Sequence, residues 1–184
     1  MKYVLPALLA VLACAWLSGP SEARTRMLHE RQAQMPAATP EQFIQKVASS
    51  NQLAIQTSQL ALDKSKNDRI RQLAQRIIDD HTKLGDELKA TLQQANIPLP
   101  NVQLDPNDQA QLNKLKKLNG AAFDRAFAAG QFQDHMQAMR LVETYSKIGT
   151  NEPLKQLASQ ALPVLQGHLK MVEALRAPSA VARR

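Results

Sequence analysis

Three of the four histidines in this chain lie at positions where a helix would bury them. His81, His135 and His168 each belong to a stripe in which hydrophobic residues recur every three or four positions. That spacing places side chains on one face of a helix, the face that packs inward. Imidazole is the commonest metal ligand and a proton carrier near neutral pH, and packing alone is a poor reason to place it in a core. The pattern therefore predicts a histidine cluster inside a helical bundle.

Three neutral imidazoles could bind one transition metal ion, with an open fourth position for water or a substrate. The sequence does not choose between zinc, copper, nickel and iron. Two alternatives remain open: the pocket could bind a small ligand, or the histidines could be core residues that bind nothing. Met139 and Met171 lie one turn after His135 and His168, and thioethers there would favour copper. We interpret both methionines instead as side chains that fill gaps in the core.

The groups that would orient these histidines are not evident from their own helices. A metal-bound histidine usually donates its second ring N–H to a carboxylate, a carbonyl or water. No carboxylate lies one turn before or after His81, whereas Asp80 and Asp134 directly precede histidines and should point about a quarter-turn away. We therefore expect the orienting partners to come from another helix or from water. Gly85 could leave room for such a water, although a tolerated glycine is the simpler interpretation.

Four long amphipathic segments must position the histidines. We predict a helix from residue 40 to the turn at Asn67, three more over 68–95, 121–147 and 151–176, and a short helix over 106–118. The two halves of the sequence repeat weakly, and each half is a hairpin of long helices. The result is an all-α four-helix bundle of two hairpins, joined by a longer crossover that contains the short extra helix. Because the helices have their middles near residues 53, 81, 135 and 165, the histidines should meet at one level, with Ala54 leaving space for water or a ligand.

Several segments resemble an exported bacterial family known as domain of unknown function 4142. The resemblance covers about residues 40–177 and rests on SQLAL at 58–62, IDDHTK at 78–83, FDRAF at 123–127, ALP at 161–163 and HL at 168–169. It implies a ferritin-like bundle in which His81, His135 and His168 match histidines common in the family. The family has no settled biochemical role, and many members are named as exported or outer-membrane proteins. Many also have an acidic residue where this chain has Ala54, and that carboxylate would complete a metal site.

A ferritin-type di-iron centre is not expected. Such a centre needs a glutamate from each of two helices and a Glu-x-x-His pair from each of the other two. Ile78 and Leu165 occupy the positions three residues before His81 and His168, and Ala54 cannot bind a metal. The chain also lacks a nucleophile elbow and a glycine-rich phosphate loop. The sequence therefore identifies no catalytic residue, disfavours a ferroxidase, and leaves open whether the protein is an enzyme.

The first residues have the pattern of a secretory signal peptide. Lys2 supplies a positive start, residues 4–17 are apolar, and small residues precede the expected cleavage after Ala23. We therefore expect a periplasmic protein with a signal peptide over 1–23, a flexible leader over 24–38, the bundle domain over 39–177 and a loose tail over 178–184. A lipoprotein anchored through Cys14, the only cysteine, is the alternative.

The chain is basic, with 23 lysines and arginines against 16 acidic residues and a formal net charge of +7. An exported basic protein can bind anionic components of the cell envelope. A metal-free interaction module that uses Lys114, Lys116 and Lys117 is therefore the alternative to metal binding, and a solvated basic surface without a partner also explains the charge. The export signal and the lack of a nucleic-acid motif exclude nucleic acid as the expected partner. The oligomeric state is not determined by the sequence.

Overall fold

The structure is a computed structural model, and it describes residues 38–176. Within this range the chain forms helices and no strand. The helices are α2 (Pro40–Lys64), α3 (Asp68–Gln94), α4 (Pro106–Lys117), α5 (Gly120–Ile148) and α6 (Glu152–Arg176). The expected signal peptide, the possible lipid anchor at Cys14, the leader before residue 38 and the tail lie outside the described residues. No helix among those described combines the length and hydrophobicity of a membrane span.

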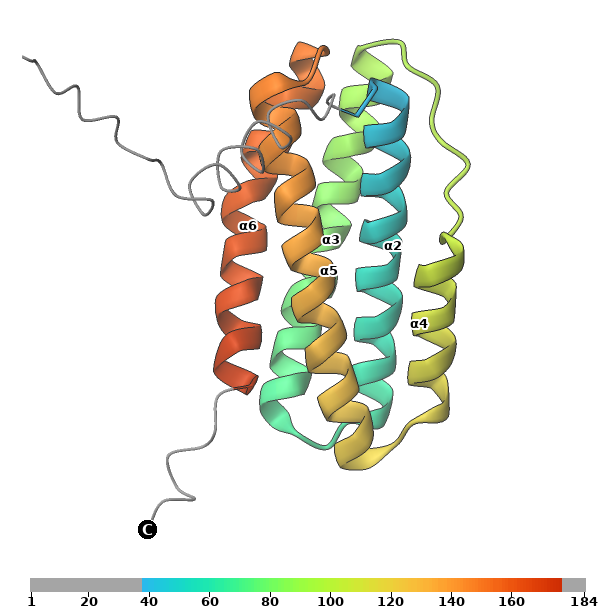
Figure 1. Ribbon diagram of the computed structural model, residues 1–184, viewed down its shortest axis with the longest axis vertical. Helices are drawn as coiled ribbons and strands as arrows, with labels where there is room; N and C mark the ends of the chain where they lie inside the picture. Colours follow the sequence, from blue (N-terminus) through green and yellow to red (C-terminus); the bar gives the residue numbers. More distant parts are fainter. Residues whose placement is uncertain (1–37, 177–184) are drawn as a thin grey trace, which may run out of the picture. The chain divides into compact units, whose positions relative to one another are not determined.

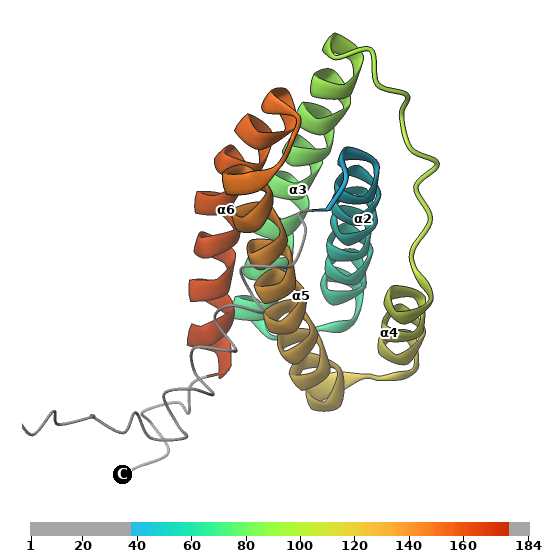
Figure 2. The same ribbon diagram turned by 45° about the horizontal axis from the view of Figure 1, so that its top comes forward.

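The four long helices form the predicted bundle of two hairpins (Figure 1). α2 packs against α3, and α5 packs against α6. The two hairpins meet where α3 contacts α6 and where α2 contacts α5. The crossover between them contains the short helix α4, which lies beside α2 in both views (Figures 1 and 2). The prediction of an all-α bundle with a short extra helix in the crossover is confirmed.

Side-chain caps determine where the first two helices begin. The Thr39 hydroxyl accepts a hydrogen bond from the Gln42 backbone, and the Gln42 side chain accepts one from the Thr39 backbone, which completes a capping box. Asn67 Oδ1 accepts from the backbone N–H groups of Arg69 and Ile70 at the start of α3. These bonds satisfy N–H groups that have no partner within the helix. They also fix which residues reach the middle of each helix.

α4 is attached to α2 at both of its ends. The Ser49 hydroxyl donates a 3.0 Å hydrogen bond to Asp108 in the first turn of α4. Lys64 Nζ donates to the carbonyl oxygens of Lys116 and Leu118 at the other end, at 2.7 and 3.0 Å. A cation is favourable at a helix C-terminus because the unpaired carbonyl groups there carry partial negative charge. The short helix therefore has a defined position on the outer side of α2.

The interior of the bundle holds two apolar clusters, one on each side of the histidines along the helices. We call them the upper and the lower cluster, following Figure 1. The upper cluster includes Phe43, Leu92, Val142, Tyr145 and Leu154. The lower cluster includes Ala61, Leu73, Ile77, Phe123, Phe127 and Val172. On α3, α5 and α6 alike, the histidine falls between the residues of the two clusters, so a polar layer divides the core.

Candidate metal centre

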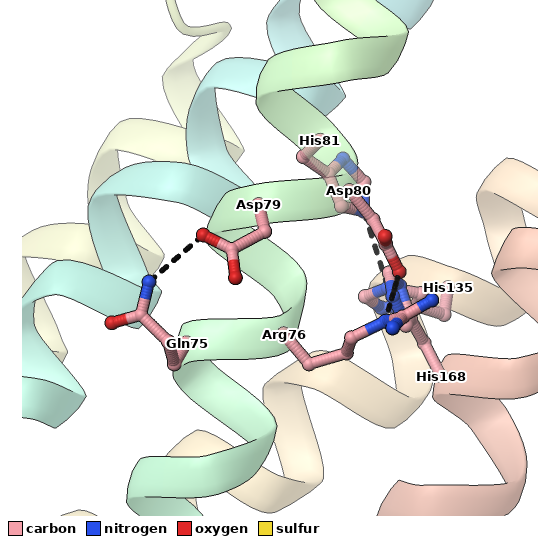
Figure 3. Close-up of polar contacts among 7 residues, drawn as sticks. All are labelled: Gln75, Arg76, Asp79, Asp80, His81, His135 and His168. Atoms are coloured by element: carbon pink, nitrogen blue, oxygen red, sulfur yellow. Dashed lines mark hydrogen bonds and ion pairs between the residues drawn. The ribbon is translucent and has the colours of Figure 1, made fainter.

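His81 on α3, His135 on α5 and His168 on α6 meet in the layer between the apolar clusters (Figure 3). The three residues are 4 %, 2 % and 2 % exposed, and their ring centroids lie 5.1 to 5.4 Å apart. His135 Nε2 is 3.0 Å from His168 Nδ1 and 3.4 Å from His81 Nε2. One nitrogen from each ring lies within 4.8 Å of the other two. The structure thus brings together all three residues that the sequence singled out.

The ring nitrogen of each histidine that points away from the centre has its own hydrogen-bond acceptor. All three bonds are 2.9 Å long, and the pairs are His81 Nδ1 with Asn51 Oδ1, His135 Nδ1 with the Gln131 carbonyl oxygen, and His168 Nε2 with Asp80 Oδ2. Carboxylate, carbonyl and amide oxygens accept hydrogen bonds and cannot donate them. Each outer ring nitrogen must therefore be the one that has the proton.

This arrangement leaves the three inner nitrogens without protons. In a neutral imidazole only one nitrogen is protonated, and the other has a lone pair. Three lone pairs consequently face one point. An ion bound tetrahedrally through bonds of 2.0–2.1 Å needs nitrogens about 3.3 Å apart. The separations of 3.0 and 3.4 Å around His135 are close to that value, but the three nitrogens as a set extend to 4.8 Å. His81 and His168 would therefore have to move closer to each other for all three rings to bind one ion.

Burial favours the neutral form of all three rings. Desolvation, together with His135 and His168, lowers the pKa of His81 well below its usual value. Desolvation and His168 lower the pKa of His135 to about 4, although the hydrogen bond to the Gln131 carbonyl acts in the opposite direction. Desolvation also lowers the pKa of His168, and Asp80 opposes that effect. Neutral imidazole is the form that binds metals. The surroundings therefore disfavour protonation of the three rings and keep them in the form that can bind a metal ion.

Asp80 connects the cluster to the protein surface. Its Oδ2 accepts hydrogen bonds from His168 Nε2 at 2.9 Å and from Arg76 Nε at 2.6 Å (Figure 3). The Asp80 side chain is 19 % exposed, and that of Arg76 is 62 % exposed. Asp80 points about a quarter-turn away from its neighbour His81, and this rotation directs it toward α6. The acceptors for His168 and His81 therefore come from other helices, as expected. The expectation was wrong for His135, whose acceptor is the Gln131 carbonyl one turn earlier on its own helix.

α2 contributes Asn51, the hydrogen-bond partner of His81, and the sequence analysis did not identify this residue. Gly85, one turn after His81, leaves room for the amide, because a Cβ at Gly85 would lie 3.1 Å from Asn51 Nδ2. A cavity of about 50 Å³ beside His81 is lined by Asn51, Gly85 and mostly apolar side chains. Ala54, where we expected free space, is 5 % exposed and packs in the lower cluster. That expectation was wrong because apolar neighbours fill the position.

The two methionines near the cluster differ in their surroundings. Met139 is partly buried and packs against the upper cluster, which agrees with its interpretation as a core residue. Met171 is 36 % exposed and lines a cavity of about 360 Å³ beside Asp80 and His168. The interpretation of Met171 as a side chain that fills a gap in the core was therefore wrong.

Solved structures with similar folds include three helical proteins. A DUF305 fragment from Deinococcus radiodurans has a TM-score of 0.65 and 21 % identity, over 76 % of this chain and 97 % of that one. CopM in its Cu(II)-bound form has a TM-score of 0.64 and 21 % identity, over 75 % and 95 %. A DUF305 protein from Streptomyces coelicolor, named as a secreted protein, has a TM-score of 0.61 and 16 % identity, over 72 % and 87 %. At these identities the similarity concerns the fold.

The sequence matches a family model, although no curated protein matches it. The model of the family described as "Domain of unknown function (DUF4142)" matches residues 25–175. That match includes α2 to α5 in full, α6 up to residue 175, and the three histidines. The chain therefore belongs to the DUF4142 family, as its resemblance to that family implied.

Proposed function

We propose that this protein binds a single transition metal ion through His81, His135 and His168. The observation that carries the proposal is the convergence of three unprotonated ring nitrogens, each belonging to a ring whose other nitrogen donates to an acceptor. The inner nitrogens cannot satisfy one another, because none has a proton to donate. One cation accepts electron density from all three.

Copper is the first ion to test. A donor set of three imidazoles suits copper, zinc, nickel and iron, and copper(II) is the most strongly bound of the divalent series. CopM, whose fold is similar at 21 % identity, is known in a Cu(II)-bound form, and this supports the same choice. The Asp80 carboxylate, which is hydrogen-bonded to His168 Nε2, would hold that ring in the tautomer that binds metal.

The proposed role is metal binding in the cell envelope. The signal peptide expected over residues 1–23 would deliver the chain to the periplasm. All three proposed ligands are buried, and the site has no acidic or nucleophilic group among its ligands that would point to a particular reaction. We therefore propose binding and retention of the ion as the function.

Elemental analysis and calorimetric titration of the full chain, prepared without a histidine tag, test this proposal. We expect one copper ion per chain and an unfolding midpoint that rises with free metal concentration, as mass action requires. His81→Ala, His135→Ala and His168→Ala should each abolish that rise. His29→Ala is the matched control, because His29 is the fourth histidine and is not one of the proposed ligands. Absence of bound metal, or retention of binding in all three site variants, would contradict the proposal.

A further inference from the structure

A surface cavity of about 360 Å³ lies between α3 and α6, at the outer edge of the histidine cluster. Arg76 and Asp80 line it from α3, and Pro163, Gly167, His168 and Met171 line it from α6. A second cavity reaches the cluster beside His81, but it measures only about 50 Å³ and no charged side chain lines it. A cation that enters a protein loses hydration free energy unless polar or charged groups replace the water, and of these two cavities only the one between α3 and α6 offers a carboxylate, that of Asp80. The cavity between α3 and α6 is therefore the better path for an ion.

We propose that this cavity is the port through which a metal ion reaches and leaves the three histidines. The inference depends on the proposed function and adds a route to it. Asp80 supplies a carboxylate oxygen and Met171 an exposed thioether on the way. Both are metal-ligand types, and the thioether suits copper in its reduced state. These groups can replace water molecules as the ion loses its hydration shell.

His168 is the residue that joins the port to the site. Its Nε2 is bonded to Asp80, which lines the cavity, and its Nδ1 lies 3.0 Å from His135 Nε2 in the interior. One imidazole ring thus separates the cavity from the inner nitrogens. A movement of this ring and of its bond to Asp80 opens the path, whereas His135 has no contact with this cavity.

Gly167 allows the port to be closed without altering the proposed ligands. A Cβ at Gly167 would meet no atom within 4 Å. A long side chain on a helix leans over the preceding turn, which here contains Pro163 and Val164, both part of the cavity lining. Gly167→Phe should therefore fill the cavity. Gln166→Phe places the same ring at a neighbouring exposed position outside the lining, and it is the matched control.

Rapid-mixing measurements with Cu(II) on the full chain test the port. In Gly167→Phe we expect the rates of binding and of release to a chelator to fall by the same factor, about tenfold or more, with an unchanged Kd. A blocked route raises the barrier between two states without changing either state. Gln166→Phe should keep the rates of the unaltered protein. Gly167→Leu introduces a smaller side chain and should slow both rates less, and it tests the port even where the phenylalanine ring disturbs the helix.

The outcomes separate the port from the site. Unaltered rates of binding and release in both Gly167 variants would overturn the proposed port. A changed release rate with an unchanged binding rate, and hence a changed Kd, would also overturn it. If the unaltered protein binds none of copper, zinc, nickel and iron, the proposed function fails and the port fails with it. If it binds metal with rates that are insensitive to Gly167, only the port fails.

Discussion

Asp80 and His168 lie 88 residues apart in the sequence, yet the Asp80 carboxylate accepts a 2.9 Å hydrogen bond from His168 Nε2. Since the carboxylate accepts and does not donate, the bond fixes the proton on Nε2 and leaves the lone pair of Nδ1 directed at His135. Arg76 bonds to the same carboxylate oxygen at 2.6 Å. The orientation of an interior nitrogen therefore depends on a charged pair that reaches the surface.

Asp80→Asn should weaken metal binding about 10–100-fold, the usual cost of losing such an orienting carboxylate. The amide preserves the shape of the side chain but removes the charge that strengthens the bond to His168, and its NH₂ group can turn toward the ring. The affinity is measured by competition with a chelator. Arg76→Gln is the control, and we expect a smaller change because Arg76 is largely exposed. An unaltered affinity in Asp80→Asn would show that the carboxylate does not position His168.

Gly85→Ala should weaken metal binding, whereas Gly167→Ala should not. The new Cβ at residue 85 would lie 3.1 Å from Asn51 Nδ2 and displace the amide that holds His81. Residue 167 has open space around it, so alanine there should raise the free energy of unfolding by about 0.5–1 kcal/mol through helix propensity. Thermal unfolding and chelator competition on both variants make the comparison. Equal stabilisation by the two substitutions, with unaltered affinity in both, would contradict the described packing of Asn51.

The metal-free protein should lose stability as the pH falls below about 6.5, the pKa of a histidine in an unfolded chain. Folding lowers the pKa of all three histidines, that of His135 to about 4. In this window the unfolded chain therefore binds protons that the folded chain does not. The stability from neutral histidines is present above the unfolded pKa and declines toward the folded values. Urea unfolding between about pH 7 and pH 4 in the presence of a chelator measures the slope, and a slope unaffected by His135→Gln would contradict this account.

Asp134 should act in the opposite direction over the same window. Burial raises the pKa of its carboxyl to about 6, against the hydrogen bond from Gln111. Its contribution is therefore present below the unfolded value of 3.8 and is lost as the pH rises through about 6. Asp134→Asn removes this contribution, so the fall in stability on acidification should become steeper. The same urea series measures it, and a shallower slope would reverse the assignment.

The basic-surface alternative leads to a separate prediction. Lys114, Lys116 and Lys117 are exposed at the end of α4. If they bind anionic vesicles, binding should weaken steeply with salt, because screening limits exposed charges to about 10 Å at 0.1 M. Replacing the three lysines with glutamate should weaken it further, whereas His168→Ala should have no effect. Co-sedimentation with vesicles decides this, and no binding at low salt would remove the alternative.

The arrangement of the helices and the histidine cluster could be predicted because they depend on local patterns. Stripes with a period near 3.6 residues define the faces that pack inward, and caps such as Thr39 and Asn67 define where helices begin. Histidines in the middle of three such stripes must then meet. This much requires no knowledge of which helices are neighbours.

The partners of the histidines depend on neighbours and rotation, so the sequence analysis did not assign them. Asp80 faces α6 because of how α3 is rotated in the bundle, and no spacing within α3 shows that. Asn51 lies one turn before Ala54 and was overlooked, although an amide close to a predicted inward face was a usable signal. Met171 lies at the edge of the inward face of α6, where spacing does not distinguish core from groove.

The polar layer between the two apolar clusters also restricts how the helices can align with one another. Two helices with uniformly apolar faces could slide past each other by one turn and still pack leucine against leucine. Such a shift here, about 5.4 Å, would move a histidine into apolar surroundings and leave Asn51 or Asp80 without its donor. A buried polar group without a partner is costly, so the shifted alignments are disfavoured. The hydrogen bonds that prepare the rings thus also select one alignment of the helices, before any ion is present.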